Sequence, residues 1–499
     1  MNPIAFIIFS LLSTTVAEEK TIFVLTHFRH GARAPQKYIN ETLHLDYALE
    51  SWDNPGELTP MGKRMHYALG LRNRERYIKQ MKFLKDQFDP HEILIYSTRF
   101  NRTLLSVAAQ LQGLYPFGTG EELTEAQKKD SVPMVELSSD VRAELDKIGD
   151  YSLPEKMSLA PIRMINDNER KVIIYDISSC LWLRNKTREE NYNKSKELRD
   201  LVSNFFNKYK DPLKEMYGNI YNGNYDIHLF DNFCDAYIAG TTEKKNMTIF
   251  KETAAKHNIN ETELLDTCFE FMKLNFKDWI SGDKNRTLPT LESSKFMREF
   301  IHYMKARVDA HINGEYNEIG TLGDYSKPKM IMFSAHDSTT SMWEMFLIKV
   351  FFDNNDTYYE FPRFANQLAF EVVIDESKLP PDHNKTYEDY TINYYFNDKL
   401  IFNKTVEEFI NKVEKALYSD EEINTICKFD KIEPTPTTEP TTENTTEPEE
   451  DKLYFTLTIV FGATTGLFLI LAIFFIIKAT RSKSSESINK EGQLLNSYD

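Results

Sequence analysis

The chain has 499 residues and a formal net charge of −16. This length gives room for one large domain or two ordinary ones, with a substantial buried core. Proteins that bind nucleic acids present a basic surface to the phosphate backbone, so we expect no nucleic-acid partner for so acidic a chain.

The first residues have the features of a secretory signal. A short apolar run spans residues 4–12, and the small residues 15–17 form a cleavage site before Glu18. The run is too short to span a bilayer. We therefore expect residues 1–17 to be a signal peptide.

Apolar and β-branched runs predict an α/β domain. The expected strands are residues 20–28, 92–98, 330–335, 369–374 and 390–396. The expected helices of this domain are residues 102–114, 338–351 and 405–418, with Ser338 as the cap of the second. We predict a mostly parallel sheet flanked by helices, built from residues 18–120 and 292–432.

Residues 121–291 have a different pattern. Strand-like runs are few, and helical patterns such as 194–209 and 261–276 dominate. We interpret this stretch as a mainly helical domain inserted into the α/β domain.

The end of the chain predicts a membrane anchor. Residues 433–452 are rich in Thr, Pro and Glu, a composition that favours an extended stalk. Residues 453–477 carry no charge and are long enough to cross a bilayer as one helix. Basic residues follow this run and acidic ones precede it, so residues 478–499 are the expected cytoplasmic tail. The globular part that precedes the stalk, residues 18–432, is called the head, and it then faces the lumen or the outside of the cell.

Glycosylation acceptors and cysteines agree with this topology. Every Asn-x-Ser/Thr pattern precedes the apolar run, at Asn40, Asn101, Asn185, Asn193, Asn246, Asn260, Asn285, Asn355, Asn384, Asn403 and Asn444. Disulfides are the default state of cysteines in an oxidising compartment. The four cysteines, at positions 180, 234, 268 and 427, allow three pairings, and their spacing does not choose among them.

The first motif that carries chemistry follows the first strand. Residues 29–35 have the sequence Arg-His-Gly-Ala-Arg-Ala-Pro. Guanidinium groups bind phosphate oxygens with paired hydrogen bonds, and a glycine lets the backbone approach an anion. A neutral imidazole can attack phosphorus. We predict that Arg29 and Arg33 bind phosphate around a nucleophile at His30. The alternative, a solvated basic loop, is disfavoured by the second arginine and the proline.

Two further motifs follow other strands. Arg102 is at the start of a predicted helix, where free backbone N–H groups favour anions, and this indicates a role in anion binding. The alternative is an arginine that faces solvent. His336 and Asp337 leave a strand together. His336 is expected to donate to a phosphate oxygen, and Asp337 to protonate the leaving oxygen and then deprotonate water. The alternative for Asp337 is simple helix capping.

Together, the three motifs resemble the histidine acid phosphatase family, which includes lysosomal and prostatic acid phosphatases and microbial phytases. The resemblance covers nearly the whole head. It implies an α/β domain with a helical insertion and no metal or other cofactor. It also implies that His30 is the phosphorylated nucleophile, that Asp337 is the proton donor, and that the phosphoryl oxygens are held by Arg29, Arg33, Arg102 and His336.

The resemblance carries further expectations. It suggests the disulfides Cys180–Cys427 and Cys234–Cys268, and a homodimer. The single membrane anchor resembles the lysosomal member, so we expect a lysosomal, endosomal or cell-surface location.

Several residues depart from the family pattern. Ala32 and Arg99 replace acidic residues common in animal acid phosphatases, which makes the rim of the site more positive and leaves the substrate open. His27 is expected to be a packed core residue, not a zinc ligand. Asn101 adjoins Arg102, so we expect this acceptor to be unmodified.

We therefore predict an acid phosphatase that acts on small phosphate monoesters. A surface glycoprotein receptor on the same fold, without activity, fits the stalk, glycosylation and anchor equally well, but the complete set of catalytic residues argues against it. A phosphoglycerate mutase-like transferase is disfavoured by the secretory topology.

Overall fold

The computed structural model describes residues 19–36, 52, 54–165, 190, 192–193, 195–217, 227–281, 286–315 and 328–427. The chain divides into two compact units, residues 1–431 and 432–499, and all described residues belong to the first. The predicted signal peptide, stalk, membrane helix and tail lie outside this part of the chain. Within it, no helix is long and apolar enough to cross a membrane.

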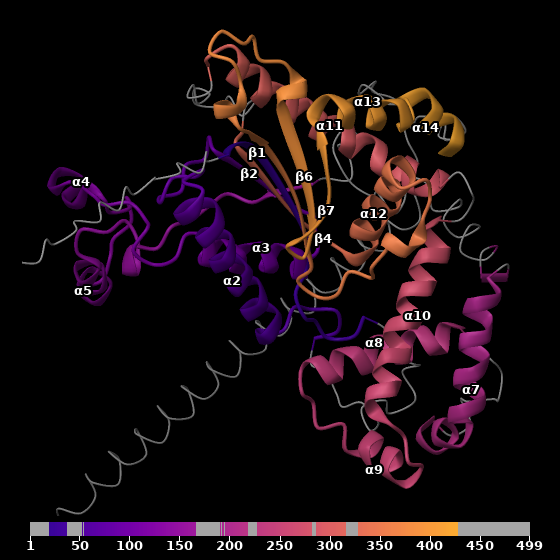
Figure 1. Ribbon diagram of the computed structural model, residues 1–499. Coiled ribbons are helices and arrows are strands. Elements are labelled where there is room, and N and C mark those ends of the chain that lie inside the picture. Colours follow the sequence, from indigo (N-terminus) through magenta and orange to yellow (C-terminus); the bar gives the residue numbers. More distant parts are fainter. Residues whose placement is uncertain are drawn as a thin grey trace, which may run out of the picture. The chain divides into compact units, whose positions relative to one another are not determined.

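A seven-stranded sheet lies at the centre of the first unit (Figure 1). Its strands, in spatial order, are β3 (Arg163–Met164), β2 (Ile93–Ser97), β4 (Met330–Ala335), β1 (Lys20–Arg29), β5 (Gln367–Ile374), β6 (Tyr390–Phe396) and β7 (Lys399–Thr405). The first four strands run parallel, whereas β1–β5, β5–β6 and β6–β7 pair antiparallel. The predicted α/β class is confirmed, but the expectation of a mostly parallel sheet holds for one half only.

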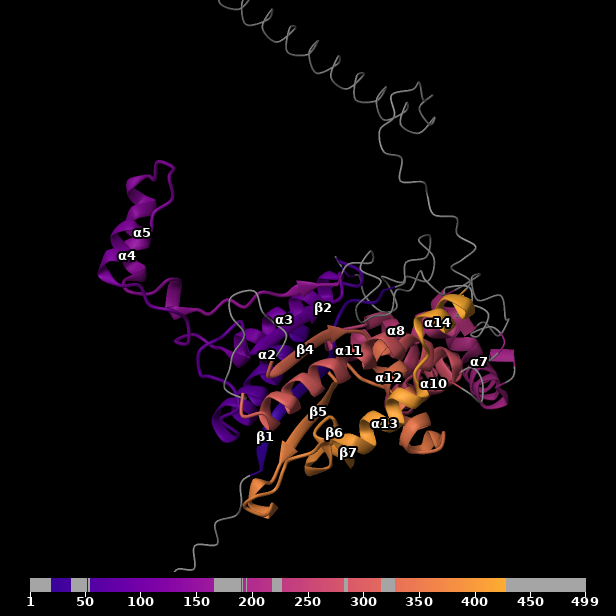
Figure 2. The ribbon, with the colours of Figure 1, turned by 90° about the horizontal axis from the view of Figure 1, so that it is seen from above.

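Helices cover both faces of the sheet (Figure 2). One face carries α2 (Pro60–Arg74) and α3 (Asn101–Leu114), and the other carries α11 (Thr287–Ile312), α12 (Asp337–Phe351) and α13 (Val406–Ala416). The side chains of β1 alternate between the two cores, because successive residues of a strand point to opposite faces. Val24 and Phe28 belong to the core under α2 and α3, while Phe23 and Leu25 pack in the core under α11 and α12.

The predicted strands and helices of the α/β domain are present, within a few residues at their ends. The predicted cap of α12 was wrong. That helix begins at Asp337, one residue before Ser338, and its N-cap residue is His336. The backbone of His336 stays extended, and the Asp337 carboxylate accepts a hydrogen bond from the Ser338 N–H at 2.8 Å. The acidic side chain therefore takes the place that the serine was expected to fill.

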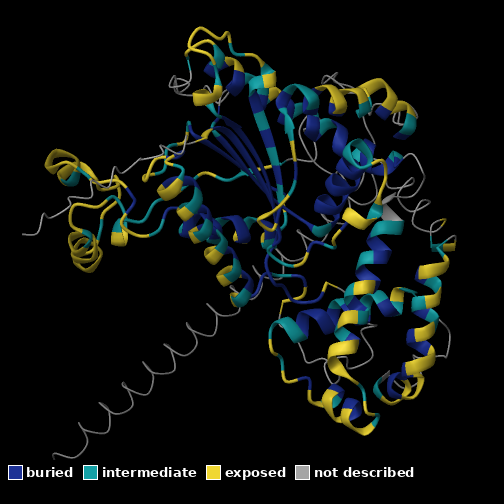
Figure 3. Ribbon diagram, viewed as in Figure 1, coloured by how far each residue is buried: buried dark blue, intermediate teal, exposed yellow. Residues whose placement is uncertain are grey.

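The described part of residues 121–291 is mainly helical. Its helices are α4 (Glu125–Asp130), α5 (Ser139–Ile148), α7 (Lys196–Tyr217), α8 (Ile227–Thr242), α9 (Thr248–Lys256) and α10 (Glu261–Ser281), and α14 (Asp420–Cys427) comes later. Helices α4 and α5 bury no residue (Figure 3). Strand β3 returns to the sheet beside β2, and α11 runs unbroken through position 291. The proposed domain boundaries stay predictions.

A disulfide joins two helices of this region. Cys234 of α8 is bonded to Cys268 of α10, and their Cα atoms are 5.1 Å apart. The suggested pairing of these two cysteines is confirmed. Cys427 is also disulfide-bonded, whereas Cys180 lies outside the described residues.

Helices α2 and α3 cross at two glycines. A Cβ atom on Gly70 would lie 1.9 Å from the carbonyl oxygen of Gln110, and one on Gly113 would lie 2.2 Å from the carbonyl oxygen of Tyr67. Only residues without a side chain permit this approach. The two glycines therefore let the backbones of α2 and α3 come into direct contact.

We expect Gly70→Ala to lower the free energy of unfolding by about 2–3 kcal/mol, because the new methyl group overlaps backbone atoms that cannot give way. Urea unfolding measures the change. Arg64→Ala, at an exposed position of the same helix, is the control and should shift stability by less than about 0.5 kcal/mol. Equal stability of the two variants would show that the helices separate without cost.

Candidate active site

Three chain segments meet at one edge of the sheet. Strands β2, β4 and β1 are neighbours and run parallel, so their carboxyl ends lie side by side. Arg29 is opposite Ala335 in the register, and Ser97 is opposite Ser334. The residues that follow all three strands therefore emerge at the same level, where ligands bind in α/β sheets.

His30 follows β1 at this edge, and only 1% of its surface is exposed. Its Nδ1 is 2.9 Å from the carbonyl oxygen of Gly31. A carbonyl only accepts, so Nδ1 carries the proton and Nε2 keeps its lone pair. Burial, and then the charges of Arg29 and Arg33, hold the pKa of His30 well below its ordinary value. This imidazole is therefore protonated less readily in acid than a free histidine.

His336 faces His30, with 5.7 Å between the ring centroids. Its Nε2 is 3.0 Å from the hydroxyl of Thr98, and its Nδ1 is 3.5 Å from a terminal nitrogen of Arg102. A guanidinium can only donate, so Nδ1 accepts and Nε2 donates to Thr98. Burial, followed by the charge of Arg102, holds the pKa of His336 well below its usual range.

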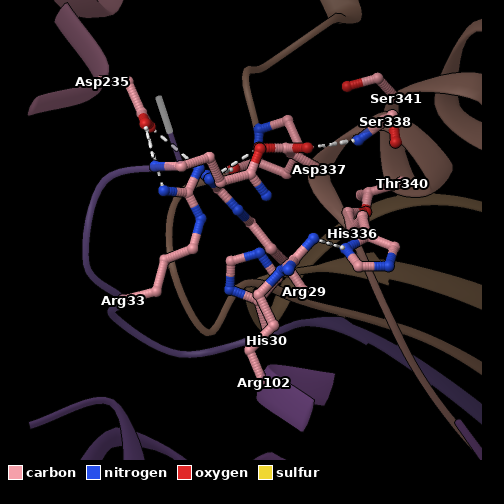
Figure 4. Close-up of polar contacts among 12 residues, drawn as sticks. Arg29, His30, Arg33, Arg102, Asp235, His336, Asp337, Ser338, Thr340 and Ser341 are labelled. Carbon is pink, nitrogen blue, oxygen red and sulfur yellow. Dashed lines mark hydrogen bonds and ion pairs between the residues drawn. The ribbon is translucent and has the colours of Figure 1, made fainter. Parts of the chain in front are cut away.

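Arg29 and Asp337 form a buried ion pair at 2.6 Å. Another nitrogen of Arg29 donates to the carbonyl oxygen of Pro362 at 2.7 Å. The guanidinium also lies over the ring of Phe364, 4.4 Å from its centroid. These three contacts fix the guanidinium of Arg29 and pair it with the Asp337 carboxylate (Figure 4).

Arg33 is held by a residue of the helical region. Two of its nitrogens donate to the two carboxylate oxygens of Asp235 at 2.9 and 3.3 Å. Arg102 lies at the start of α3, and its guanidinium is 4.5 Å from the centroid of the Phe100 ring. Burial is the main reason why the pKa of Arg102 falls to about 10.

The three arginines share one feature that points to an anion. The Nε atoms of Arg29, Arg33 and Arg102 are all buried, and none has a hydrogen-bond partner within the described residues. Leaving a buried donor unpaired costs about 1–3 kcal/mol, and more when it is charged. Three such donors around one imidazole make a preformed cradle for the oxygens of an anion (Figure 4).

The same surroundings offer little to a cation. Among the residues that the structure describes, no group of three or more His, Cys, Asp or Glu side chains is arranged to hold a metal ion. The carboxylates of Asp235 and Asp337 are each already paired with an arginine.

Two residues that support the site were not predicted from the sequence. His66 of α2 is buried, and its Nε2 donates to the backbone carbonyl of Arg29 at 3.1 Å. The Nδ1 of His66 lies 3.1 Å from the side-chain amide of Gln110. Asp235 is the other missed residue. Neither stands beside a recognisable motif, so no local signal would have identified them.

The lack of a side chain at Gly31 allows α2 to approach the loop that follows β1. A Cβ atom on Gly31 would lie 2.4 Å from the carbonyl oxygen of Gly62, in the first turn of α2. The backbone N–H of Gly31 donates to Ser106 of α3 at 3.1 Å. The loop after β1 is therefore pressed between the two helices, which fixes the position of His30.

The remaining predicted residues lie as follows. His27 is fully buried and contacts the hydroxyl of Thr340 at 2.8 Å, which confirms it as a core residue. Burial lowers its pKa to about 3. Arg99 is exposed. Asn101 is also exposed and donates to Glu57 at 3.2 Å; its lack of modification stays a prediction.

Residues 22–397 match the sequence family described as the histidine phosphatase superfamily, branch 2. The chain belongs to this superfamily. It is therefore a phosphoric monoester hydrolase, and the family predicted from the three motifs is confirmed.

This histidine phosphatase has low to moderate sequence identity to individual members of known function or structure. It is 25% identical to mouse testicular acid phosphatase over 385 residues, which cover 74% of this chain and 72% of that protein. It is 36% identical to human prostatic acid phosphatase over 113 residues, 22% of this chain and 28% of that protein. A solved phytase from Hafnia alvei has a TM-score of 0.48 and 13% identity, and the match covers 83% of this chain and 99% of the phytase.

His66 should make the protein less stable in acid. Its pKa is lowered to about 4, chiefly by burial, from an ordinary value of 6.5. A histidine kept neutral by the fold contributes fully above the unfolded pKa, and its contribution is lost as the pH falls from 6.5 toward 4. We expect this loss to be on the order of 3 kcal/mol at pH 4.

Urea unfolding of the wild type and of His66→Gln between pH 7 and pH 4 checks this. His66→Gln should be less stable than the wild type at pH 7, but its free energy of unfolding should fall less between pH 7 and pH 4. His302→Gln, exposed on α11, is the control and should keep the wild-type pH dependence. Parallel curves for the wild type and His66→Gln would contradict the assignment.

Proposed function

We propose that this histidine phosphatase hydrolyses phosphate monoesters through a phosphate carried on His30, with Asp337 as the proton donor. The observation that carries the proposal is the set of three buried, unpartnered Nε–H groups around an imidazole whose Nε2 is free to attack. Such donors stabilise charge that develops on the three phosphoryl oxygens during transfer.

In the first step, Nε2 of His30 attacks phosphorus. The new N–P bond forms as the bond from phosphorus to the ester oxygen breaks. The electron pair goes to the ester oxygen, which takes a proton from Asp337 and leaves as an alcohol. The carbonyl of Gly31 accepts from Nδ1–H at 2.9 Å and so stabilises the positive ring of phosphohistidine.

In the second step, water attacks phosphorus. Its proton passes to the Asp337 carboxylate, the N–P bond breaks, and inorganic phosphate leaves with the imidazole neutral again. One feature favours catalysis at acidic pH: the lowered pKa of His30 keeps the lone pair of its imidazole available for attack.

Arg29, Arg33, Arg102 and His336 would hold the phosphate. A neutral His336 accepts from Arg102 through Nδ1, so in this state it cannot donate to phosphate from that atom. A bound phosphate favours protonation of His336, because its negative charge offsets the arginines that lower the pKa. Both ring nitrogens then donate.

The surroundings of the head support a position outside the cytosol. The Cys234–Cys268 disulfide is typical of an oxidising compartment. The predicted acceptors that the structure describes are exposed, namely Asn193, Asn246, Asn260, Asn355, Asn384 and Asn403. Asn40, Asn185 and Asn285 lie outside the described residues. We propose that the head is glycosylated and that the chain is anchored through residues 453–477.

His30→Ala should lower kcat/KM for 4-nitrophenyl phosphate by at least about a thousandfold, because the substitution removes the imidazole that attacks phosphorus. Brief incubation with a labelled ester and an alkaline quench, which preserves N-phosphate, should give label on His30 in the wild type only. His302→Ala should keep full activity. Unchanged turnover in His30→Ala would refute the mechanism and favour a different role for the fold.

Asp337→Asn should show a loss that depends on the leaving group. An alkyl alcohol is a poor leaving group and needs the proton, so kcat/KM for an alkyl phosphate should fall by about a hundredfold or more. The loss for 4-nitrophenyl phosphate should be much smaller, since nitrophenolate leaves without a proton. Steady-state kinetics with both esters measures the two losses. Equal losses would mean that Asp337 is not the proton donor.

A further inference from the structure

One contact to the site comes from outside the sheet edge. Asp235 lies on α8, in the helical region, and is about 200 residues from Arg33 along the chain. Both oxygens of its carboxylate accept from Arg33, and one of them also accepts from the backbone N–H of Gln36 at 2.9 Å. A single side chain thus binds both the arginine and the loop that carries it.

This contact decides which donors of Arg33 remain for a ligand. A guanidinium has five N–H groups in a rigid plane. Two of them point to Asp235, and a third points to the carbonyl oxygen of Ala34 at 3.0 Å. Among the residues that the structure describes, the buried Nε–H has no hydrogen-bond partner. Because the group is planar, fixing one edge against the carboxylate also fixes the direction of Nε–H.

Helix α8 is itself held near this loop. Glu243, directly after the helix, accepts from the hydroxyl of Thr59, the N-cap residue of α2. The side chain of Asp235 is only 16% exposed, and that of Arg33 is 5% exposed. The carboxylate therefore acts from a fixed place and is little weakened by solvent.

We propose that Asp235 is a positioning residue that orients Arg33 and thereby sets the phosphate affinity of the site. The proposal rests on the proposed function, since it takes phosphate as the ligand. Two opposite effects are possible for a carboxylate here. Its negative charge repels an anion, whereas its two hydrogen bonds from Arg33 orient that arginine for binding an anion. The paired geometry and the neighbouring unpartnered Nε–H favour the second effect.

The test is binding of inorganic phosphate to the folded protein by calorimetry, which requires no turnover. Asp235→Asn keeps the size of the side chain but removes one acceptor oxygen and the charge. We expect phosphate to bind about tenfold more weakly to this variant. The same change made in an Arg33→Ala background should alter the affinity by less than about twofold, because Asp235 acts through Arg33. Glu252→Gln, an exposed acid on α9, should bind like the wild type.

Tighter binding to Asp235→Asn, equal binding, or the same loss in both backgrounds would overturn the proposal. If Asp235→Asn does not fold, as judged by near-ultraviolet circular dichroism, Asp235→Glu replaces it in the same cycle. Asp235→Glu keeps the charge but displaces the carboxylate. A loss of phosphate affinity that disappears in the Arg33→Ala background again supports positioning. Any other result opposes it. A wild type that does not bind phosphate would instead refute the proposed function.

Discussion

The site depends on keeping three guanidinium groups around one neutral imidazole, with Arg29 and Arg33 buried and Arg102 half-buried. Positive charges at such short range repel each other, and burial raises the cost of each charge. Two carboxylates relieve part of this cost. Asp337 pairs with Arg29 and Asp235 pairs with Arg33, so each acid lowers the charge while leaving an Nε–H group unpaired. The unliganded site is therefore stable enough to fold, yet it still lacks the acceptor that its remaining donors require.

The rigidity of this arrangement comes from backbone contacts. The loop after β1 is fixed where Gly31 meets Gly62 and where its N–H donates to Ser106. His66 binds the carbonyl of Arg29 from α2. A nucleophile must be held in line with the bond that breaks, and a displacement of about 1 Å can cost two orders of magnitude in rate. Helices α2 and α3 thus serve the chemistry although neither carries the nucleophile.

The helical region takes part in the site as well. Asp235 of α8 reaches Arg33, and the disulfide between Cys234 and Cys268 joins α8 to α10 directly beside it. A covalent bond next to Asp235 limits how far α8 can move relative to α10. The α/β part and the helical region therefore meet at the Arg33–Asp235 pair, and both contribute to the geometry of the anion cradle.

The sequence by itself determined the α/β class, the strands that precede each motif, and the family, because strand periodicity and short motifs are local properties of the chain. It also placed His27 in the core. It did not determine the antiparallel half of the sheet, the cap at His336, or the roles of His66 and Asp235. These depend on which surfaces meet after folding. Asp235 contacts Arg33 only because α8 packs against the loop, and no pattern within either segment records a partner some 200 residues away.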